Sequence, residues 1–186
     1  MNQENKSHFQ PSKSEIQPLL IAFNGHNFKE AVRVGKQLLE KYPNAFFICN
    51  VLGSCLANMG KKNDSLHFFY KAYEINPKIP ESCSNLGMAL QQLGKFDEAE
   101  KKLEFASYLK PRVPQIHNNL GFTLEKCGRL DDAVSAYRRA ISLKPDFFEA
   151  YYNLANTLKN LGMVGEAEAN YRQAISLKPS HVESHY

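Results

Sequence analysis

The sequence lacks both a long apolar run and an excess of one charge. No window reaches the roughly 18 uninterrupted apolar residues that a membrane-spanning helix needs, and the richest stretch, residues 46–59, is interrupted by Asn50, Ser54 and Asn58. The 23 basic and 19 acidic residues are interspersed and give a net charge of +4, whereas nucleic-acid-binding proteins concentrate basic residues in a patch. We therefore expect neither a membrane nor a nucleic acid as partner.

Cysteine is scarce, and the first 14 residues are polar, without the apolar segment of a secretory signal. None of the four cysteines shows the two-residue spacing typical of metal ligands. We expect buried free thiols in a reducing compartment, and hence a cytoplasmic protein. The cysteines are Cys49, Cys55, Cys83 and Cys127.

Catalytic and metal-binding patterns are also missing. The six histidines have no partnered nucleophile and no metal-ligand spacing, and His117 falls in a column of packing residues. No glycine-rich loop is present that would cradle a phosphate, because the glycines belong to the repeat described next. We predict no enzyme within these 186 residues, no catalytic residue, no metal site and no cofactor.

Prolines, by contrast, recur every 34 residues, and a glycine lies 17 residues before each of the last four. Proline cannot continue a helix, because its ring lacks the N–H and clashes with the preceding turn. A fixed period of 34 therefore predicts helix–turn–helix repeats stacked into a solenoid. The two columns are Pro43, Pro77, Pro111, Pro145, Pro179 and Gly60, Gly94, Gly128, Gly162.

Further columns keep the same period, among them Leu52, Leu86, Leu120, Leu154 and Ala72, Ala106, Ala140, Ala174. This pattern resembles the tetratricopeptide repeat over residues 12–186. The resemblance implies an all-α fold, a right-handed superhelical solenoid of antiparallel helix pairs.

The period divides the chain into a polar tail, repeats and an incomplete end. We expect a disordered tail (1–11), a degenerate capping repeat (12–45) and the start of a sixth repeat (182–186). In the capping repeat, Pro18 replaces the usual leucine, so we expect a short first helix from Pro18 to Asn24 and a second from Phe28 to Lys41. The four regular repeats are 46–79, 80–113, 114–147 and 148–181.

Since no repeat buries its own apolar face, the last repeat should leave Tyr171, Ala174 and Ile175 uncovered. We expect one of two explanations: the chain is the N-terminal part of a longer protein, or it self-associates through this end.

By the family's geometry, the first helices line a concave groove. Asn85, Asn119 and Asn153 share one position there and form a predicted ladder, whose amides match the peptide groups of an extended ligand. Local packing of the same asparagines is the open alternative. Selectivity is predicted to come from the variable groove positions Asn50, Ser84, Met88, Asn118, Phe122, Tyr152, Asn156 and Lys159. Alternatively, some of the apolar residues in this set contact adjacent helices instead of a ligand.

The predicted function is a protein-interaction scaffold that binds an extended peptide or a partner helix in this groove. The alternative is the substrate-recruiting arm of a larger glycosyltransferase or sulfotransferase, because the ladder and residues 153–179 resemble the repeats of O-linked N-acetylglucosaminyl transferases. A clamp for the acidic tails of chaperones is excluded, because the basic residues of that clamp are missing: its lysine position holds Asn50, Ser84, Asn118 and Tyr152.

Overall fold

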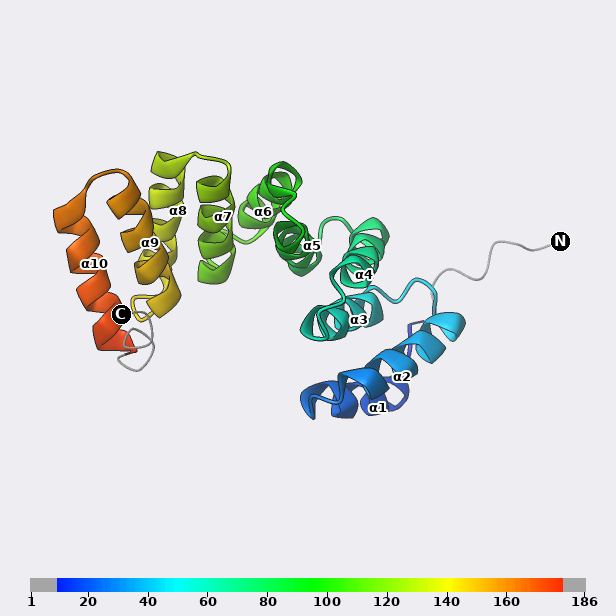
Figure 1. Ribbon diagram of the computed structural model, residues 1–186. Helices are drawn as coiled ribbons and strands as arrows, with labels where there is room; N and C mark the ends of the chain where they lie inside the picture. The colour runs from blue at the N-terminus through cyan, green and yellow to red at the C-terminus, as the bar shows by residue number, and fades with distance from the viewer. Residues whose placement is uncertain (1–9, 179–186) are drawn as a thin grey trace. The chain divides into compact units, whose positions relative to one another are not determined.

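The computed structural model describes residues 10–178, and this part of the chain consists of ten α-helices without a strand (Figure 1). The helices form two compact units, an N-terminal unit within residues 1–94 and a C-terminal unit within residues 95–186. The N-terminal unit holds α1 (Lys13–Asn24), α2 (Phe28–Lys41), α3 (Phe46–Asn58), α4 (Lys62–Ile75) and α5 (Pro80–Gln92). The C-terminal unit holds α6 (Phe96–Leu109), α7 (Pro114–Lys126), α8 (Leu130–Leu143), α9 (Phe148–Asn160) and α10 (Val164–Leu177).

The periodic residues stand where the helices end, which confirms the predicted all-α repeat. Each odd-numbered helix from α3 to α9 is followed by one of the four periodic glycines, with φ between 72° and 79°. This left-handed backbone is open to glycine and strained for most other residues. The periodic prolines from Pro43 to Pro145 follow the second helix of each pair.

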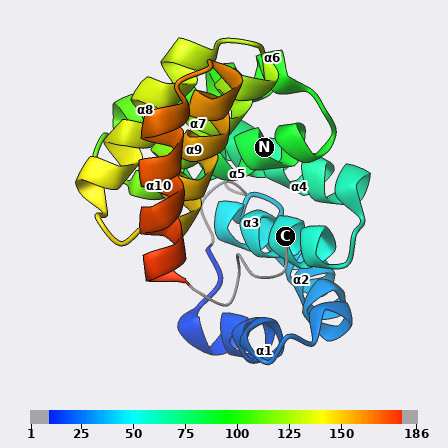
Figure 2. The same ribbon diagram turned by 60° about the vertical axis from the view of Figure 1, so that its left-hand side comes forward.

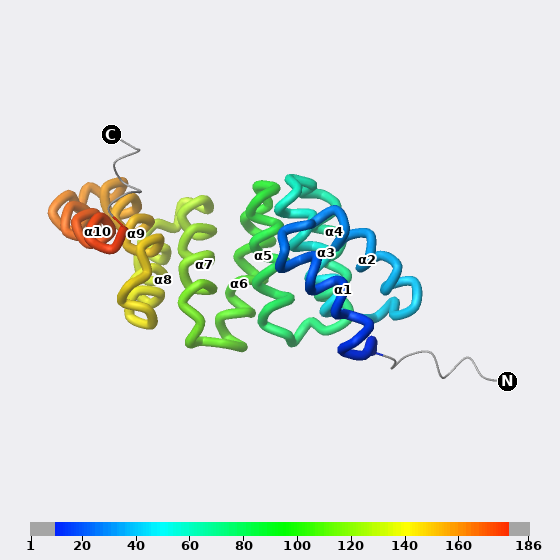
Figure 3. The backbone as a smooth tube through the Cα atoms, turned by 90° about the horizontal axis from the view of Figure 1, so that it is seen from below, coloured from blue at the N-terminus to red at the C-terminus, as the bar shows by residue number. Residues whose placement is uncertain are grey.

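Within each unit, every helix packs on the one before and the one after it. Figure 1 shows the C-terminal unit as a row from α6 to α10, and in the turned view of Figure 2 helices α7 to α10 overlap. Figure 3 shows α1 and α2 at the end of the N-terminal unit opposite α5. First helices of successive pairs also touch, α3 against α5 and α7 against α9. The first helices thus form one face of each unit, which is where the groove is predicted.

The core lies between the helix pairs. In the N-terminal unit, Gly35 of α2 lies so close to Leu52 of α3 that a Cβ at Gly35 would stand 2.7 Å from the leucine Cδ2 atom. In the C-terminal unit, Leu154 and Leu158 of α9 pack with Tyr137 of α8, and all three are buried. Leu52 and Leu154 of the periodic column thus lie in contacts between two successive repeats.

The prediction that the first helix begins at Pro18 is wrong, because α1 begins at Lys13 and contains Pro18. Ser12 and Glu15 form a capping box: the Glu15 N–H donates to Ser12 Oγ (3.3 Å), and the Ser12 N–H donates to Glu15 Oε2 (2.9 Å). The Glu15 carboxylate also accepts a hydrogen bond from the Tyr42 hydroxyl (2.6 Å) and pairs with the Lys41 ammonium (2.5 Å). These bonds lower the pKa of Glu15 and tie the start of α1 to the end of α2.

The second helix of this repeat, predicted from Phe28 to Lys41, is confirmed as α2. The predicted disordered tail lies, except for residues 10 and 11, outside the described residues, as does the predicted start of a sixth repeat. Within residues 10–178, no helix has the length and the apolar character needed to cross a membrane. The four cysteines are free thiols, and Cys127 alone among them is partly exposed.

Candidate functional site

The predicted ladder residues lie on first helices, at a position that leaves each side chain partly exposed. Asn85 belongs to α5 in the N-terminal unit, whereas Asn119 and Asn153 belong to α7 and α9 in the C-terminal unit. The structure therefore places two of the three predicted rungs on neighbouring helices of one unit, and the third on the other unit.

Asn85 is engaged with a second asparagine that the sequence analysis had assigned a different role. Its amide nitrogen donates to Asn50 Oδ1 of α3 at 3.1 Å. The Asn50 amide nitrogen in turn lies 3.2 Å from the Phe46 carbonyl oxygen and 3.2 Å from Ser82 Oγ. Asn50 is thus the acceptor for Asn85 and a link between two first helices.

The same bond recurs in the C-terminal unit, where the Asn153 amide nitrogen of α9 donates to Asn118 Oδ1 of α7 at 3.2 Å. Both pairs are separated by 35 residues, one more than the repeat period, because the acceptor stands one position before the donor within its repeat. The sequence analysis missed these pairs since it compared positions 34 apart. A search at spacing 35 would have found them.

The hydrogen bonds within the pairs leave part of each amide available. An asparagine side chain offers two N–H donors and an oxygen acceptor, and the bond to the neighbouring asparagine uses one donor of Asn85 or Asn153. Because the donor asparagine is held by its neighbour, its remaining N–H and oxygen have a fixed direction. Packing and ligand binding, the two alternatives for the ladder, are therefore compatible in these side chains.

Aromatic rings stand beside the asparagines in the C-terminal unit. The Tyr152 ring stacks on Phe148 with centroids 6.1 Å apart and meets the edge of Tyr171 of α10 at 6.0 Å. The Tyr171 hydroxyl donates to Asn156 Oδ1 at 2.5 Å. Two predicted selectivity residues, Tyr152 and Asn156, are thereby joined through Tyr171, which packs the middle of α9 against α10.

A carboxylate lies on the same first helices. Glu125 of α7 accepts a hydrogen bond from Thr157 Oγ1 of α9 (3.1 Å) and one from the Tyr137 hydroxyl (3.4 Å). Burial and the Glu125 charge raise the pKa of Tyr137 well above its ordinary value. Nearby, Phe122 carries the Lys126 ammonium over its ring at 5.1 Å from the centroid. Glu125 thus joins α7 to α9 through Thr157 and to α8 through Tyr137.

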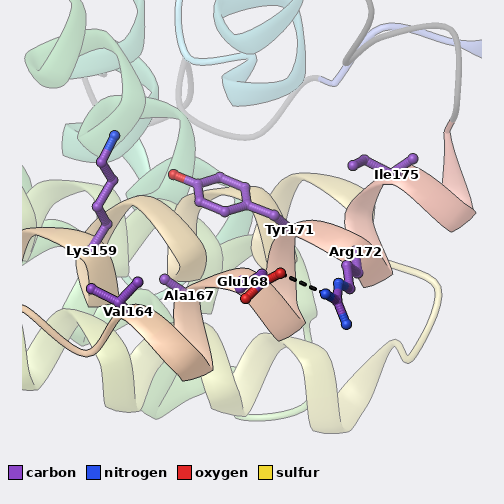
Figure 4. Close-up of a pocket in the computed structure, with 7 residues that line it drawn as sticks. All are labelled: Lys159, Val164, Ala167, Glu168, Tyr171, Arg172 and Ile175. Carbon is purple, nitrogen blue, oxygen red and sulfur yellow. Dashed lines mark hydrogen bonds and ion pairs between the residues drawn. The ribbon is translucent and has the colours of Figure 1, made fainter.

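The other predicted selectivity residues divide between the units. Ser84 and Met88 are partly exposed on α5, in the same unit as Asn50 and Asn85. Lys159 is exposed and lines a hollow of about 430 Å³ beside α10 (Figure 4), together with Tyr171, whose hydroxyl donates to Asn156.

No metal-binding cluster is present within residues 10–178. His117 Nε2 lies 2.9 Å from the Pro111 carbonyl oxygen, so this side chain is hydrogen bonded locally. The same residues contain no group of three or more histidine, cysteine, aspartate or glutamate side chains that could hold a metal ion.

Stacked helix pairs, four of them with a left-handed glycine after the first helix, define a helical-repeat protein. Comparison with protein families matches the tetratricopeptide repeat at residues 48–79, 81–104 and 148–181, and a further TPR repeat at residues 126–162. Together these matches cover more than half of the 186 residues. The chain belongs to the tetratricopeptide repeat family, a non-catalytic scaffold class that supports a role in protein interaction.

Solved structures of similar fold include a crystal structure of MamA, 22% identical, with a TM-score of 0.78 over 93% of this chain and 94% of that one. MamA from residue 41 to its end, from Desulfovibrio magneticus RS-1, is 18% identical, with a TM-score of 0.82 over 91% of this chain and 96% of that one. At these identities the likeness establishes the fold alone. No curated protein matches the chain in sequence.

Proposed function

We propose that the chain is a protein-interaction scaffold that binds an extended peptide along the first helices of its repeats. The observation that carries this proposal is the pair Asn118–Asn153, which joins α7 and α9 on a partly exposed face with aromatic Tyr152 next to it. Amides held in a fixed direction suit the N–H and C=O groups of a peptide backbone, and an aromatic ring suits an apolar side chain of that peptide.

The energy of the ladder limits what it does alone. One hydrogen bond contributes about 1 kcal/mol net, whereas even a millimolar dissociation constant requires about 4 kcal/mol. The asparagines are therefore expected to set the direction and register of the peptide. Most of the affinity would come from the selectivity residues of the C-terminal unit, Phe122, Tyr152 and Asn156, together with Asn118.

The test uses a peptide selected on this chain from a random-sequence library displayed on phage, labelled with a fluorophore. Asn153→Ala and Asn119→Ala are each expected to weaken its binding in fluorescence anisotropy by about fivefold, the equivalent of one hydrogen bond. The matched control is Asn170→Ala on α10, where the amide nitrogen donates to the carbonyl oxygen of Glu166 in its own helix (2.8 Å).

Stability is measured beside affinity, because Asn153→Ala also removes the bond to Asn118 and should cost about 1 kcal/mol of unfolding free energy. A loss of stability with unchanged peptide affinity in both ladder variants would leave packing as the role of the asparagines and refute the proposal. The same peptide binding equally to the Asn170→Ala protein shows that the effect is confined to the ladder.

The alternative function, a substrate-recruiting arm of a larger glycosyltransferase or sulfotransferase, is supported by the sequence resemblance of residues 153–179 to the repeats of O-linked N-acetylglucosaminyl transferases. Reading the coding sequence beyond Tyr186 distinguishes the two functions. Several hundred residues with an α/β pattern would favour the arm.

We propose a cytoplasmic location for this scaffold. The support is that all four cysteines are free and that Cys49, Cys55 and Cys83 are buried among apolar residues, as expected where thiols stay reduced. Fractionation of cells followed by detection of the chain with an antibody tests this location.

A further inference from the structure

The outer side of α10 has apolar residues of the kind that pack against a neighbouring helix. Among the described residues, no helix covers this side. Val164 is 67% exposed and Ile175 is 38% exposed. The residues at the same repeat positions of α8, Leu130 and Ile141, are partly buried, and Ile141 packs against the core cluster that includes Leu154 and Leu158 of α9. Figure 4 shows the hollow on this face, lined by α10 and by Lys159 of α9.

The outer side of α1, at the other end of the described residues, is also uncovered. Ile21 is 64% exposed, although the corresponding residues of the four later first helices are at most 3% exposed. Cys55, the counterpart of Ile21 in α3, belongs to a core cluster with residues of α1 and α2. Ile21 lines a hollow of about 590 Å³ together with Pro18, Gln17, Asn27 and Glu30. A first helix is normally covered by the pair before it, and α1 has no such cover among the described residues.

We propose that these two faces bind each other between two copies of this chain, the α1 face of one copy on the α10 face of the next, in the register of the solenoid. The proposal concerns surfaces other than the groove and does not rest on peptide binding. It also specifies contacts. For a contact between two successive repeats within the chain, we call its counterpart the pair of residues at the same repeat positions in the last repeat of one copy and the first repeat of the next.

The first counterpart is an ion pair. Arg138 of α8 pairs with Glu166 of α10 at 2.7 Å. In the next repeat, the position of Arg138 is held by Arg172. In the first repeat, the position of Glu166 is held by Glu30. Arg172 lines the hollow on α10 and Glu30 lines the hollow at α1. The docked copies would thus repeat an interaction that the chain already makes, with opposite charges facing each other.

The second counterpart is a polar contact. Glu100 of α6 pairs with Arg129, just before α8. Their counterparts on the exposed faces are Glu168 and Asn27. Asn27 already accepts a hydrogen bond from the Glu30 N–H through its oxygen (3.3 Å), so its amide nitrogen can donate to the Glu168 carboxylate.

The third counterpart is apolar. Thr157 of α9 contacts Glu125 of α7, and the counterparts of these two residues are Ile21 and Lys159. The side chain of Ile21 would cover the aliphatic stem of Lys159. All six counterparts line one of the two hollows, Arg172, Glu168 and Lys159 at α10, and Glu30, Asn27 and Ile21 at α1.

In the single chain, the charged residues of both faces form ion pairs with neighbours on their own helices. Arg172 pairs with Glu168 (2.5 Å), and Arg33 pairs with Glu30 (2.6 Å). Such exposed pairs are worth at most about 1 kcal/mol, so exchanging them for contacts between copies costs little. Because the two faces differ, the contact is heterologous and generates a ring or an open chain of copies.

Sedimentation velocity of the 186-residue chain at increasing concentration tests the proposal. The unsubstituted chain is expected to form species larger than a monomer. R172E and E30R should each weaken association by roughly tenfold or more, because each places like charges in the contact. The matched controls are R139E on α8 and E40R on α2, which reverse exposed charges outside both faces and should associate like the unsubstituted chain.

Mixing R172E with E30R gives the decisive measurement. In the mixture, one contact pairs the two reversed charges and the other pairs the two original ones, so association should return. A monomer at every concentration, association that neither reversal weakens, or a mixture that remains monomeric would each overturn the proposal. Melting curves equal to that of the unsubstituted chain show that the variants are folded, which is expected because Arg172 is exposed and the Glu30 side chain is 40% exposed.

Discussion

Two helix pairs of the C-terminal unit have a tyrosine at the same repeat position, but the two tyrosines differ in burial. In α7–α8, a Cβ at Gly121 would stand 2.7 Å from the Tyr137 ring, and Tyr137 is fully buried. In α9–α10, Ala155 takes the place of Gly121, and Tyr171 remains partly exposed. The glycine lets the ring lie directly against the first helix, and the alanine methyl group occupies that space.

The hydroxyl groups also point to different acceptors. The Tyr137 hydroxyl donates to Glu125, whose position in the next repeat is held by Lys159. An ammonium group cannot accept a hydrogen bond, so the Tyr171 hydroxyl donates to Asn156 instead. Tyr137 also packs with Leu154 and Leu158 of the next helix pair, whereas α10 is the last helix among the described residues. Residues of the first helix and the cover of a following pair thus decide together how a tyrosine of the second helix is packed.

The largest effect is expected from Gly121→Ala. The added methyl group must displace the Tyr137 ring, and overpacking of this kind costs about 1–3 kcal/mol, partly offset by the better helix propensity of alanine. Urea unfolding measures the loss. The control is Gly165→Ala in α10, where no atom lies within 4 Å, and stability should be unchanged or slightly higher. Equal stabilities of the two variants would show that the ring does not need the glycine.

The second prediction concerns alkaline pH. Burial raises the pKa of Tyr137 in the folded chain, whereas the unfolded chain has the ordinary value near 10. The contribution of Tyr137 is therefore complete below pH ~10 and decreases above it by about 1.4 kcal/mol per pH unit, because only the unfolded chain loses the proton. Urea unfolding from neutral to alkaline pH should show a steeper decline for the unsubstituted chain than for Tyr137→Phe. Parallel declines would contradict a buried, protonated Tyr137.

The third prediction compares loss of the two hydroxyl groups at neutral pH. Tyr137→Phe should cost about 1 kcal/mol, because it removes a buried hydrogen bond to Glu125. Tyr171→Phe should cost less, since water can reach the Asn156 oxygen that it leaves. Thermal melting of both variants checks this order, and the reverse order would mean that exposure does not decide the cost.

The smallest effect is expected from Ala155→Gly, which makes α9 resemble α7. Glycine inside a helix costs about 0.5–1 kcal/mol relative to alanine. If the ring of Tyr171 then approaches α9 as Tyr137 approaches α7, packing recovers part of this loss. Urea unfolding of the single variant and of Ala155→Gly with Tyr171→Ala separates the two contributions. If the Ala155→Gly substitution costs the same unfolding free energy with and without the Tyr171 ring, the ring does not move closer.

The sequence predicts the fold well because its period has a local physical cause. The turns at Gly60, Gly94, Gly128 and Gly162 require a left-handed backbone, and the prolines mark helix ends, so both columns are visible without knowledge of tertiary contacts. Pro18 suggests a later start of α1 than the structure has. The true start is marked by the Ser12–Glu15 capping box, which is also a local signal and visible in the sequence.

The site is less predictable, since it depends on pairs of residues. The position of the asparagines on first helices follows from the period, but the bonds Asn50–Asn85 and Asn118–Asn153 join different positions of successive repeats. The repeat position of Lys159 predicts a groove residue, but its neighbours come from the second helix of its own pair: it lines a hollow together with Tyr171 and Arg172 of α10.

The uneven placement of the thiols has a practical consequence. Cys49, Cys55 and Cys83 are all buried in the N-terminal unit, and burial raises the pKa of Cys55 to about 11. A buried thiol with so little thiolate reacts with an alkylating reagent only after its surroundings open. In a Cys127→Ser chain, the rate of alkylation would therefore record the opening of the N-terminal unit alone, without any engineered label.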